Sequence, residues 1–285
     1  MKPAPFSYVV ARSADDVVAA LADGRTDVLA GGQSLVLEMN YRARRPARLV
    51  DINRVPGFDR LEPDGDVLRV GPLVRHRAFE GDTVPGPLGT LLRRVVHHIA
   101  HPPIRARGTL LGSLAYAHPA AEWPAVVTAL GADLELTGRD GHRTVSAADF
   151  FRGPFDTARR AGELLTELRV PLLPPGTRVG FAEHRRTHAS FAQLAVIAAV
   201  TLTQGRVSAA RIGLVNAADR PVRAHGAEAA LLNRPLDDPA ITEAGRVAAE
   251  QDADPRPQPH ADLGYQRHAV AVLTRRALAQ ARDQG

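Results

Sequence analysis

Cysteine is absent from this chain of 285 residues, and Lys2 is its only lysine. Without cysteine, the chain forms no disulfide, has no thiolate nucleophile and does not itself ligate an iron–sulfur cluster. With lysine only at position 2, it also lacks the residue for a Schiff base or for a phosphate-binding loop that ends in Gly-Lys-Ser/Thr. Any ligand must therefore be held by other groups.

Long apolar runs, basic blocks and aromatic residues are scarce as well. No run approaches the roughly 20 apolar residues that cross a bilayer, and the first residues, MKPAPFSYVV, do not have the pattern of a signal peptide. We therefore expect a cytoplasmic protein without a membrane span. The net charge of +5 comes from scattered arginines, and aromatic residues make up 5% of the chain. This composition argues against a nucleic-acid partner.

The rest of the composition is that of a globular protein, with 45% hydrophobic and 24% charged residues. Ser13 and Asp16 predict a capping box at the start of a helix that ends at Gly24. Further helices are predicted over 34–42, over 86–101, where the following prolines stop the helix, and over 122–130. Strands are predicted over 26–31, 47–52, 66–74, 132–138 and within 162–173.

The Pro-Pro-Gly at 174–176 is the best candidate domain boundary. After it, three strands follow one another, with a tight turn at Gln204-Gly205. Three helices then close the chain, beginning at Arg223, Asp238 and Asp262. This order predicts an α+β fold with domains over 1–174 and 178–285, the second built on an antiparallel three-stranded sheet with helices.

Two adjacent glycines, Gly31 and Gly32, lie where the strand over 26–31 meets the next helix. Glycine allows backbone conformations that other residues avoid, and it lets amide groups approach a ligand. With Ser34 as the N-cap, the helix would direct its N-terminal amides and its dipole at the same point, as in phosphate sites. An ordinary tight turn is the alternative interpretation.

A second loop of this kind occurs in RGTLLGSLAYAHPAAE, residues 107–122, where Gly, Thr and Ser again precede a helix. It could offer amides and hydroxyls to the same ligand. Two such loops, more than seventy positions apart, suit a ligand with a pyrophosphate and a long polar arm. A structural crossover loop is the alternative.

Four segments together resemble the flavoprotein (medium) subunit of the carbon monoxide dehydrogenase and xanthine dehydrogenase family, the molybdenum hydroxylases. They are LAGGQSLVLEMNYRARRPARLVDINRVPG, HPPIRARGTLLGSLAYAHPAAEWPA, DFFRGPFDTARRAGELLTELRVP and YQRHAVAVLTRRAL. The resemblance runs from about Phe6 to the C-terminus. It implies an FAD-binding domain in two lobes, about 1–56 and 57–174 (PCMH-like), followed by a smaller α+β domain.

The resemblance also implies a function and partners. In the family, FAD relays electrons from iron–sulfur clusters on a small subunit, which receives them from a molybdenum cofactor on a large subunit, to an acceptor. The absence of cysteine fits this arrangement, because the chain would hold only the flavin. A homodimer is compatible with the sequence. Neither the substrate nor the acceptor can be read from it.

Carried over by position, the resemblance assigns the following residues to FAD: Ala30, Gly31, Gly32, Gln33, Ser34 and Leu35 in the first loop; Gly108, Thr109, Gly112 and Ser113 in the second; and His118 and Phe191, the latter near the isoalloxazine.

Four departures from the family pattern surround this set. Leu111 replaces a glycine of the second loop, His118 replaces an aspartate, and Pro103 and Ala106 replace two amide residues. The isobutyl group of Leu111 would block the backbone approach to the pyrophosphate, and His118 would bring a cation to the ribityl chain. These changes predict weakened FAD binding, which Leu111→Gly would restore.

Two alternative functions therefore stay open. In one, the flavin site is lost and the interdomain pocket performs a non-redox step such as cyclisation or isomerisation, with Tyr116, His118 and His188 as acid–base candidates. In the other, the chain is a non-catalytic assembly subunit. His97 and His101 have helical i, i+4 spacing, but no cysteine or carboxylate completes a metal site there, so we expect no metal.

Overall fold

The computed structural model describes residues 2–258 and 261–284, and its chain begins with a small α/β lobe. Three parallel strands lie in the order β1-β3-β2. The predicted capping box between Ser13 and Asp16 is present at the first helix. The lobe consists of β1 (Ser7–Val10), α1 (Ala14–Leu21), β2 (Thr26–Leu29), α2 (Leu35–Asn40) and β3 (Arg48–Asp51).

The middle lobe is built on an antiparallel sheet in the order β4-β5-β10-β6-β7. Its strands are β4 (Leu61–Asp64), β5 (Val67–Val70), β6 (Asp133–Gly138), β7 (Gly141–Ser146) and β10 (Leu164–Pro171). Its helices are α3 (Gly86–Val96), α4 (Pro102–Arg105), α5 (Leu110–Tyr116), α6 (Glu122–Leu130), α7 (Ala147–Phe150) and the 3₁₀ turn η1 (His76–Phe79). A small hairpin, β8 (Phe151–Gly153) and β9 (Asp156–Thr157), precedes β10.

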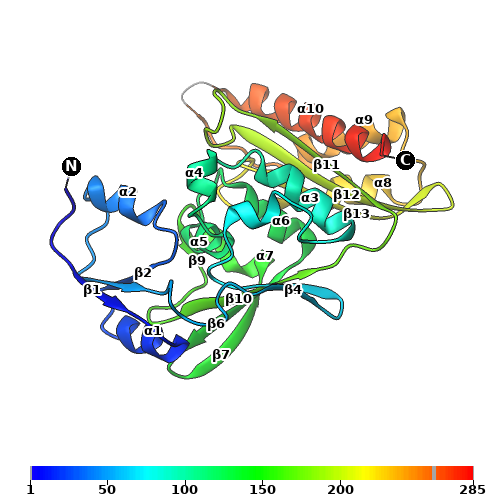
Figure 1. The fold of residues 1–285 in the computed structure, drawn as a ribbon. Coiled ribbons are helices and arrows are strands. Elements are labelled where there is room, and N and C mark those ends of the chain that lie inside the picture. Colours follow the sequence, from blue (N-terminus) through cyan, green and yellow to red (C-terminus); the bar gives the residue numbers. More distant parts are fainter. Residues whose placement is uncertain (1, 259–260, 285) are drawn as a thin grey trace.

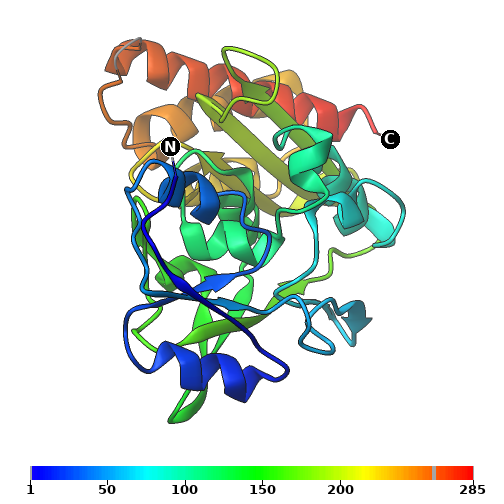
Figure 2. The ribbon, with the colours of Figure 1, turned by 60° about the vertical axis from the view of Figure 1, so that its left-hand side comes forward.

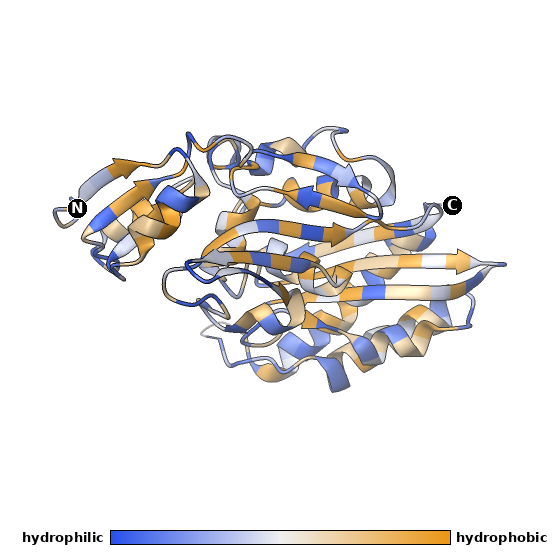
Figure 3. Cartoon of the chain, turned by 90° about the horizontal axis from the view of Figure 1, so that it is seen from below, coloured by the Kyte–Doolittle hydropathy of each residue, from blue (hydrophilic) through white to orange (hydrophobic). Residues whose placement is uncertain are grey.

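Helices cover one face of this sheet (Figure 1), and charged side chains on the strands pair with one another. Glu167 on β10 accepts hydrogen bonds from Arg69 and Arg169, and Arg169 also pairs with Glu135. Figure 3 looks from below, and orange and blue residues alternate along strands in this view. This alternation places apolar side chains toward the helices and charged ones toward solvent.

The C-terminal domain has a four-stranded antiparallel sheet in the order β11-β12-β13-β14. Its elements are β11 (Thr177–His184), β12 (Leu194–Thr203), β13 (Arg206–Val215), β14 (Val222–Arg223), α8 (His225–Leu231), α9 (Asp238–Val247), a π-helical turn η2 (Ala248–Asp252) and α10 (Leu263–Arg282). The turn at Gln204-Gly205 has positive φ at both residues, as predicted. The short strand β14 was not predicted.

The two faces of this sheet pack on different partners. Helices α8 to α10 cover one face, and α3 and α6 of the middle lobe lie against the other (Figure 1). Trp123 of α6, Phe181 of β11 and Ile197 of β12 therefore belong to one continuous core. The C-terminal domain is thus fixed to the middle lobe by buried apolar surface.

Several predicted element boundaries were wrong. The helix predicted over 86–101 ends at Val96, so His97 and His101 do not lie one turn apart on one helix. Pro102 and Pro103 begin α4 instead of merely ending a helix, because proline fits the first turn, where the amide has no partner. Ser34 stands at the predicted N-cap position of α2, but it has helical backbone angles and its side chain makes no capping hydrogen bond.

Gly180 lies in β11 at a point where α10 packs closely against the strand, so a substitution there tests this contact. A Cβ built on Gly180 would overlap the carbonyl oxygen of Ala277 in α10 and lie 2.8 Å from its carbonyl carbon. Gly180→Ala should therefore lower the free energy of unfolding by about 1–3 kcal/mol, because the helix must move away from the sheet. Chemical denaturation measures the change.

The matched control is Gly81→Ala, since a Cβ at Gly81 meets nothing within 4 Å. This control should stay within about 0.5 kcal/mol of the unchanged chain. Equal stability of the two variants would contradict the close contact between Gly180 of β11 and Ala277 of α10.

Candidate cofactor-binding site

A cleft of about 650 Å³ lies between the N-terminal and middle lobes, and residues 189–191 of the C-terminal domain reach it. Figure 2 brings the N-terminal lobe forward, in front of the middle-lobe helices. Every residue that the sequence assigned to FAD lines this cleft: Ala30, Gly31, Gly32, Gln33, Ser34, Leu35, Gly108, Thr109, Gly112, Ser113, His118 and Phe191. Residues far apart in the sequence are thus brought to one place.

The two predicted loops touch each other through their backbones at Gly31. A Cβ on Gly31 would overlap the carbonyl oxygen of Arg107 and lie 2.8 Å from the Cα of Gly108. Gly32 has a φ of +73°, which favours glycine. The glycine pair therefore serves a close loop–loop approach as well as an open amide surface.

A hydrogen-bond network stabilises the contact between the two loops. The guanidinium of Arg75 donates to the side-chain oxygen of Asn53 and to the carbonyl oxygen of Arg107. The side-chain amide of Asn53 in turn donates to the carbonyl oxygen of Ala30 at 2.9 Å. The first loop and the second loop are thus tied together by one arginine and one asparagine.

The first loop presents unpaired amide groups to the cleft. Within the described residues, the backbone N–H groups of Gly32, Gln33 and Ser34 donate to no protein acceptor. The side chain of Gln33 turns back and donates to the carbonyl oxygen of Gly31 at 3.2 Å. Successive free amides form a concave site for an anion. Gly32 and Ser34 are partly exposed and Gln33 is exposed, so these amides are accessible to an acceptor on a ligand.

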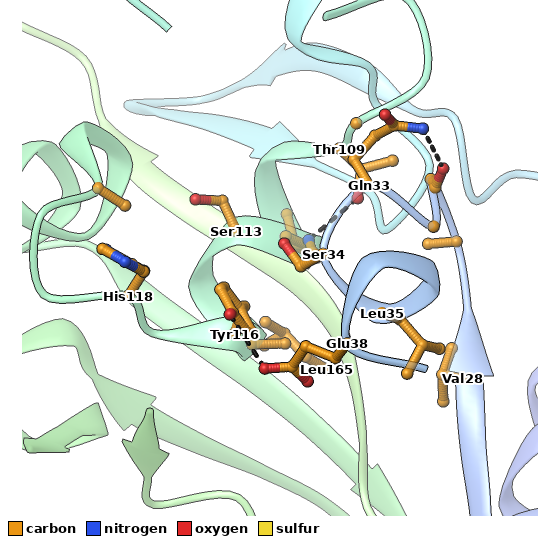
Figure 4. Close-up of a pocket in the computed structure, with 18 of the residues that line it drawn as sticks. Val28, Gln33, Ser34, Leu35, Glu38, Thr109, Ser113, Tyr116, His118 and Leu165 are labelled. Carbon is orange, nitrogen blue, oxygen red and sulfur yellow. Dashed lines mark hydrogen bonds between the residues drawn. The ribbon is translucent and has the colours of Figure 1, made fainter. Parts of the chain in front are cut away.

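The second loop is organised differently from the first. The Thr109 hydroxyl accepts a hydrogen bond from the amide of Gly112 at 3.0 Å and caps α5. That amide is therefore not free for a ligand. The hydroxyls of Ser113 and Ser34 make no hydrogen bond with the described protein, and they point to the same side of the loops in Figure 4. The Ser113 hydroxyl is thus one donor that this loop offers.

Leu111 lines the cleft, but most of its side chain is packed in the core. Only 2% of its surface is exposed, and its side chain belongs to the main apolar core. Pro103 and Ala106 are not among the residues that line the cleft. Pro103 and Ala106 therefore give no reason for weakened FAD binding, whereas for Leu111 weakened binding stays a prediction. Leu111→Gly should also open a cavity in the core.

An aromatic group forms the wall of the cleft near His118. The ring of Phe191 stacks on His118 with centroids 3.8 Å apart and planes 4° apart, and the edge of Phe155 meets His118 at 5.2 Å. His118 Nδ1 accepts from the amide of Ala120 at 3.1 Å, and burial lowers the pKa of His118. His118 is therefore a neutral, flat surface at neutral pH, and the expected cation is absent.

The proposed acid–base set does not assemble. The Tyr116 hydroxyl donates to Glu38 across the cleft at 3.0 Å, and burial together with this bond raises the pKa of Tyr116 to about 12. His188 is not among the residues that line the cleft and lies against His101, with ring centroids 5.6 Å apart. The three candidates Tyr116, His118 and His188 thus share no catalytic geometry.

Two cleft residues were missed by the sequence analysis. His76 is buried, and its Nδ1 accepts a hydrogen bond from Trp123 Nε1 at 3.0 Å. Burial, followed by the charges of Arg105 and Arg75, lowers the pKa of His76 to about 4. A Cβ on Gly108 would lie 2.8 Å from the His76 ring, so His76 supports the second loop from beneath. It is neutral at pH 7.

Glu122 is the second missed residue, at the start of α6. It lines the cleft, yet only 5% of its surface is exposed. Burial, and then the negative charge of Glu183, raise the pKa of Glu122 to about 8. Only its place directly after the second loop could have drawn attention to it. A neutral carboxyl group at neutral pH can both donate and accept a hydrogen bond in the cleft.

No metal centre accompanies this cleft in the part of the chain that the structure describes. Among residues 2–258 and 261–284, no three His, Asp or Glu side chains gather as ligands would. None of the helices there is long and apolar enough to span a membrane.

Two family models match nearly the whole chain. The FAD binding domain in molybdopterin dehydrogenase matches residues 4–173, and the CO dehydrogenase flavoprotein C-terminal domain matches residues 180–281. The chain belongs to this family of flavoprotein subunits. The resemblance and the α+β fold that the sequence predicted are thereby confirmed, and FAD is the cofactor of this oxidoreductase subunit.

Individual relatives align with this chain along nearly its full length. The chain is 37% identical over 284 residues to 6-hydroxypseudooxynicotine dehydrogenase complex subunit alpha of Paenarthrobacter nicotinovorans, covering 99% of this chain and 96% of that one. It is 32% identical to the carbon monoxide dehydrogenase medium chain of Afipia carboxidovorans, with 99% and 98% covered. The structure of reconstituted CO dehydrogenase from Oligotropha carboxidovorans superposes with a TM-score of 0.95 at 32% identity, with both chains fully covered.

The loop contact at Gly31 leads to a direct test. Gly31→Ala should separate the two loops and raise the dissociation constant for FAD at least about tenfold, because the added methyl group displaces the Arg107 carbonyl. Equilibrium titration followed by flavin fluorescence measures it. Gly153→Ala is the control, since a Cβ there meets nothing within 4 Å. Unchanged FAD binding by Gly31→Ala would refute the role of the contact.

The raised pKa of Glu122 predicts that the stability of the folded chain depends on pH. The folded chain keeps the Glu122 proton up to about pH 8, whereas an ordinary glutamate loses it near 4.5. Between these values the native state binds the additional proton, so this carboxyl contributes stability that is lost as pH rises through the window. Glu122→Gln removes this contribution, and the variant should gain in melting temperature over the unchanged chain as pH approaches 8.

Thermal unfolding across that pH range provides the measurement, with the exposed Glu62→Gln as the control. A constant difference in melting temperature between Glu122→Gln and the unchanged chain at every pH would contradict the raised pKa of Glu122.

Proposed function

We propose that this chain is the flavin-bearing relay subunit of a molybdenum hydroxylase complex. It receives electrons from an iron–sulfur subunit, which a molybdenum-containing subunit supplies, and passes them to an acceptor. The names of its relatives support this proposal, since they are medium subunits or subunits of dehydrogenase complexes. The single observation that carries it is the row of free amides at Gly32, Gln33 and Ser34, facing a cleft large enough for a dinucleotide.

The residues of the chain bind and orient FAD in this proposal. The amides of the first loop and the Ser34 and Ser113 hydroxyls hold the pyrophosphate, for which a lysine is not needed. The stacked pair His118 and Phe191 offers a flat apolar surface to a ring of the cofactor. Bound FAD supplies the redox chemistry, and the protein supplies position and electrostatics.

In the proposed function, another subunit of the complex selects the substrate. Relatives whose names mention 6-hydroxypseudooxynicotine, nicotine and carbon monoxide all align along nearly the full chain. The fold is thus kept while the oxidised compound changes, as expected if another subunit binds the substrate. The cytoplasmic location and the partner subunits are predictions from the sequence and the family.

The two alternative functions have less support. The non-redox alternative relied on Tyr116, His118 and His188 as a set, but Tyr116 is bound to Glu38 and His188 is not among the residues that line the cleft. An assembly subunit without a cofactor has no use for the free amides of the first loop.

The test uses the chain co-expressed with its iron–sulfur and molybdenum subunits. The complex should be yellow, and reduced clusters should pass electrons to the flavin and then to a quinone or NAD⁺. A flavin-depleted complex should keep reducible clusters but lose acceptor reduction, and added FAD should restore it. A colourless chain that does not bind added FAD, or acceptor reduction without flavin, would overturn the proposal.

A further inference from the structure

A hydrogen bond between two side chains crosses the cofactor cleft from one lobe to the other. The Tyr116 hydroxyl, at the end of α5 in the middle lobe, donates at 3.0 Å to Oε1 of Glu38, in α2 of the N-terminal lobe. The two residues are 78 positions apart in the sequence, and both line the cleft. Figure 4 draws this bond as a dashed line, and we refer to it as the Glu38–Tyr116 bridge.

The bridge lies one helical turn from the two free hydroxyls of the cleft. Ser34 precedes Glu38 by four positions, and its carbonyl oxygen accepts the Glu38 amide at 3.1 Å. Ser113 precedes Tyr116 by three positions in α5. Residues three or four positions apart lie on the same face of a helix. Each serine therefore faces the cleft with one member of the bridge, and Figure 4 shows both serines on the same side of the bond.

Both members of the bridge are held in place within their own lobes. The Tyr116 ring packs against Phe155 with centroids 5.1 Å apart. Burial and the bond to Glu38 raise the pKa of Tyr116 to about 12, so its hydroxyl keeps the donated proton at neutral pH. The backbone oxygen of Glu38 accepts the amide of Arg44, whose guanidinium donates twice to Asp27 at 2.7 Å. The two side chains thus meet with little freedom to lose.

The lobes do not depend on the bridge for their attachment. Leu73 and Leu164 of the middle lobe share an apolar cluster with Val17 and Val50 of the N-terminal lobe. The backbone contact at Gly31 joins the lobes at a second place. Loss of the bridge should therefore change the freedom of α2 relative to α5, on the two sides of the cleft, and leave the fold intact.

We propose that Glu38 and Tyr116 are positioning residues for FAD, and that the bond between them fixes the spacing of the two cofactor loops and slows release of the cofactor. This inference rests on the proposed function, because it takes the cleft as the flavin site. With the bond already formed, the Ser34 and Ser113 hydroxyls stand at the separation at which one ligand meets both. Binding then does not have to order the loops. Gains of this kind appear mostly in the dissociation rate.

The first test measures the dissociation rate of FAD from the full chain, by rapid dilution followed by flavin fluorescence. Tyr116→Phe removes the hydroxyl and keeps the ring that packs on Phe155. It should raise the rate about fivefold or more, the scale of one lost hydrogen bond. Glu38→Ala should have the same effect. Release that is equal or slower in Tyr116→Phe would overturn the proposal, because the bond would then be neutral or an obstacle to the cofactor.

Tyr41→Phe is the matched control for the loss of a tyrosine hydroxyl. Tyr41 directly follows α2, is 68% exposed and is not among the residues that line the cleft. This variant should release FAD at the rate of the unchanged chain. A rate raised as much as in Tyr116→Phe would contradict a specific role of the bridge.

Two further variants separate positioning through this bond from a general structural effect. Glu38→Gln keeps a side-chain oxygen that accepts from Tyr116, so its release rate should stay within about twofold of the unchanged chain. Glu38→Ala combined with Tyr116→Phe should release FAD no faster than either single variant, because both changes remove the same bond. Additive effects in the double variant, or a loss in Glu38→Gln equal to that in Glu38→Ala, would overturn the proposal.

The bridge is also tested without FAD, which separates this inference from the proposed function. In the FAD-free chain, the amides of residues 35–40 in α2 should exchange with deuterium faster in Tyr116→Phe than in Tyr41→Phe. Equal exchange in these two variants would overturn the bridge, whether or not the chain binds FAD. Failure of the unchanged chain to bind FAD would contradict the proposed function. Normal FAD binding with equal release rates would contradict only the bridge.

Discussion

The contact between two backbones at Gly31 is the constraint on which the cofactor site depends. The first loop comes from the parallel N-terminal lobe and the second from the middle lobe, and no side chain separates them at this point. Arg75 and Asn53 hold the two loops in register. The free amides of the first loop and the Ser113 hydroxyl of the second therefore face one ligand. A site of this kind needs precise backbone placement more than it needs charge, so in the proposed function a chain with one lysine can still hold a pyrophosphate.

The rest of the molecule positions this contact. The middle sheet and its helices form the main core, and the C-terminal sheet packs on α3 and α6 of that core. This packing brings Phe191 to His118. The C-terminal domain thus completes the aromatic wall of the cleft. Its attachment to the middle lobe is therefore part of the site.

The sequence predicted those features that depend on local chemistry. The capping box at Ser13, the turn at Gln204-Gly205 and the helix over 122–130 all follow from nearby residues, and each is present. The edge strands β4 and β7 were missed because they are short, polar and mostly exposed, so they lack an apolar alternation. Pro63 within β4 is tolerated because β4 is an edge strand.

The loops themselves were predictable, but the directions of their side chains were not. Family position placed Leu111 next to the ligand, whereas the start of α5 turns its side chain into the core. Glu122 was missed because its burial depends on the packing of α6 against distant parts of the chain, and no local pattern shows this. Contacts between residues so far apart in the sequence could not be predicted from the sequence.

Hydrogen–deuterium exchange of the amides in the two loops tests the central claim most directly. On addition of FAD, the backbone amides of Gly32, Gln33 and Ser34 should become strongly protected, and the second loop around Ser113 should become protected with them. FAD binding that leaves the exchange of the first loop unchanged would contradict the account, because the pyrophosphate would then be held elsewhere.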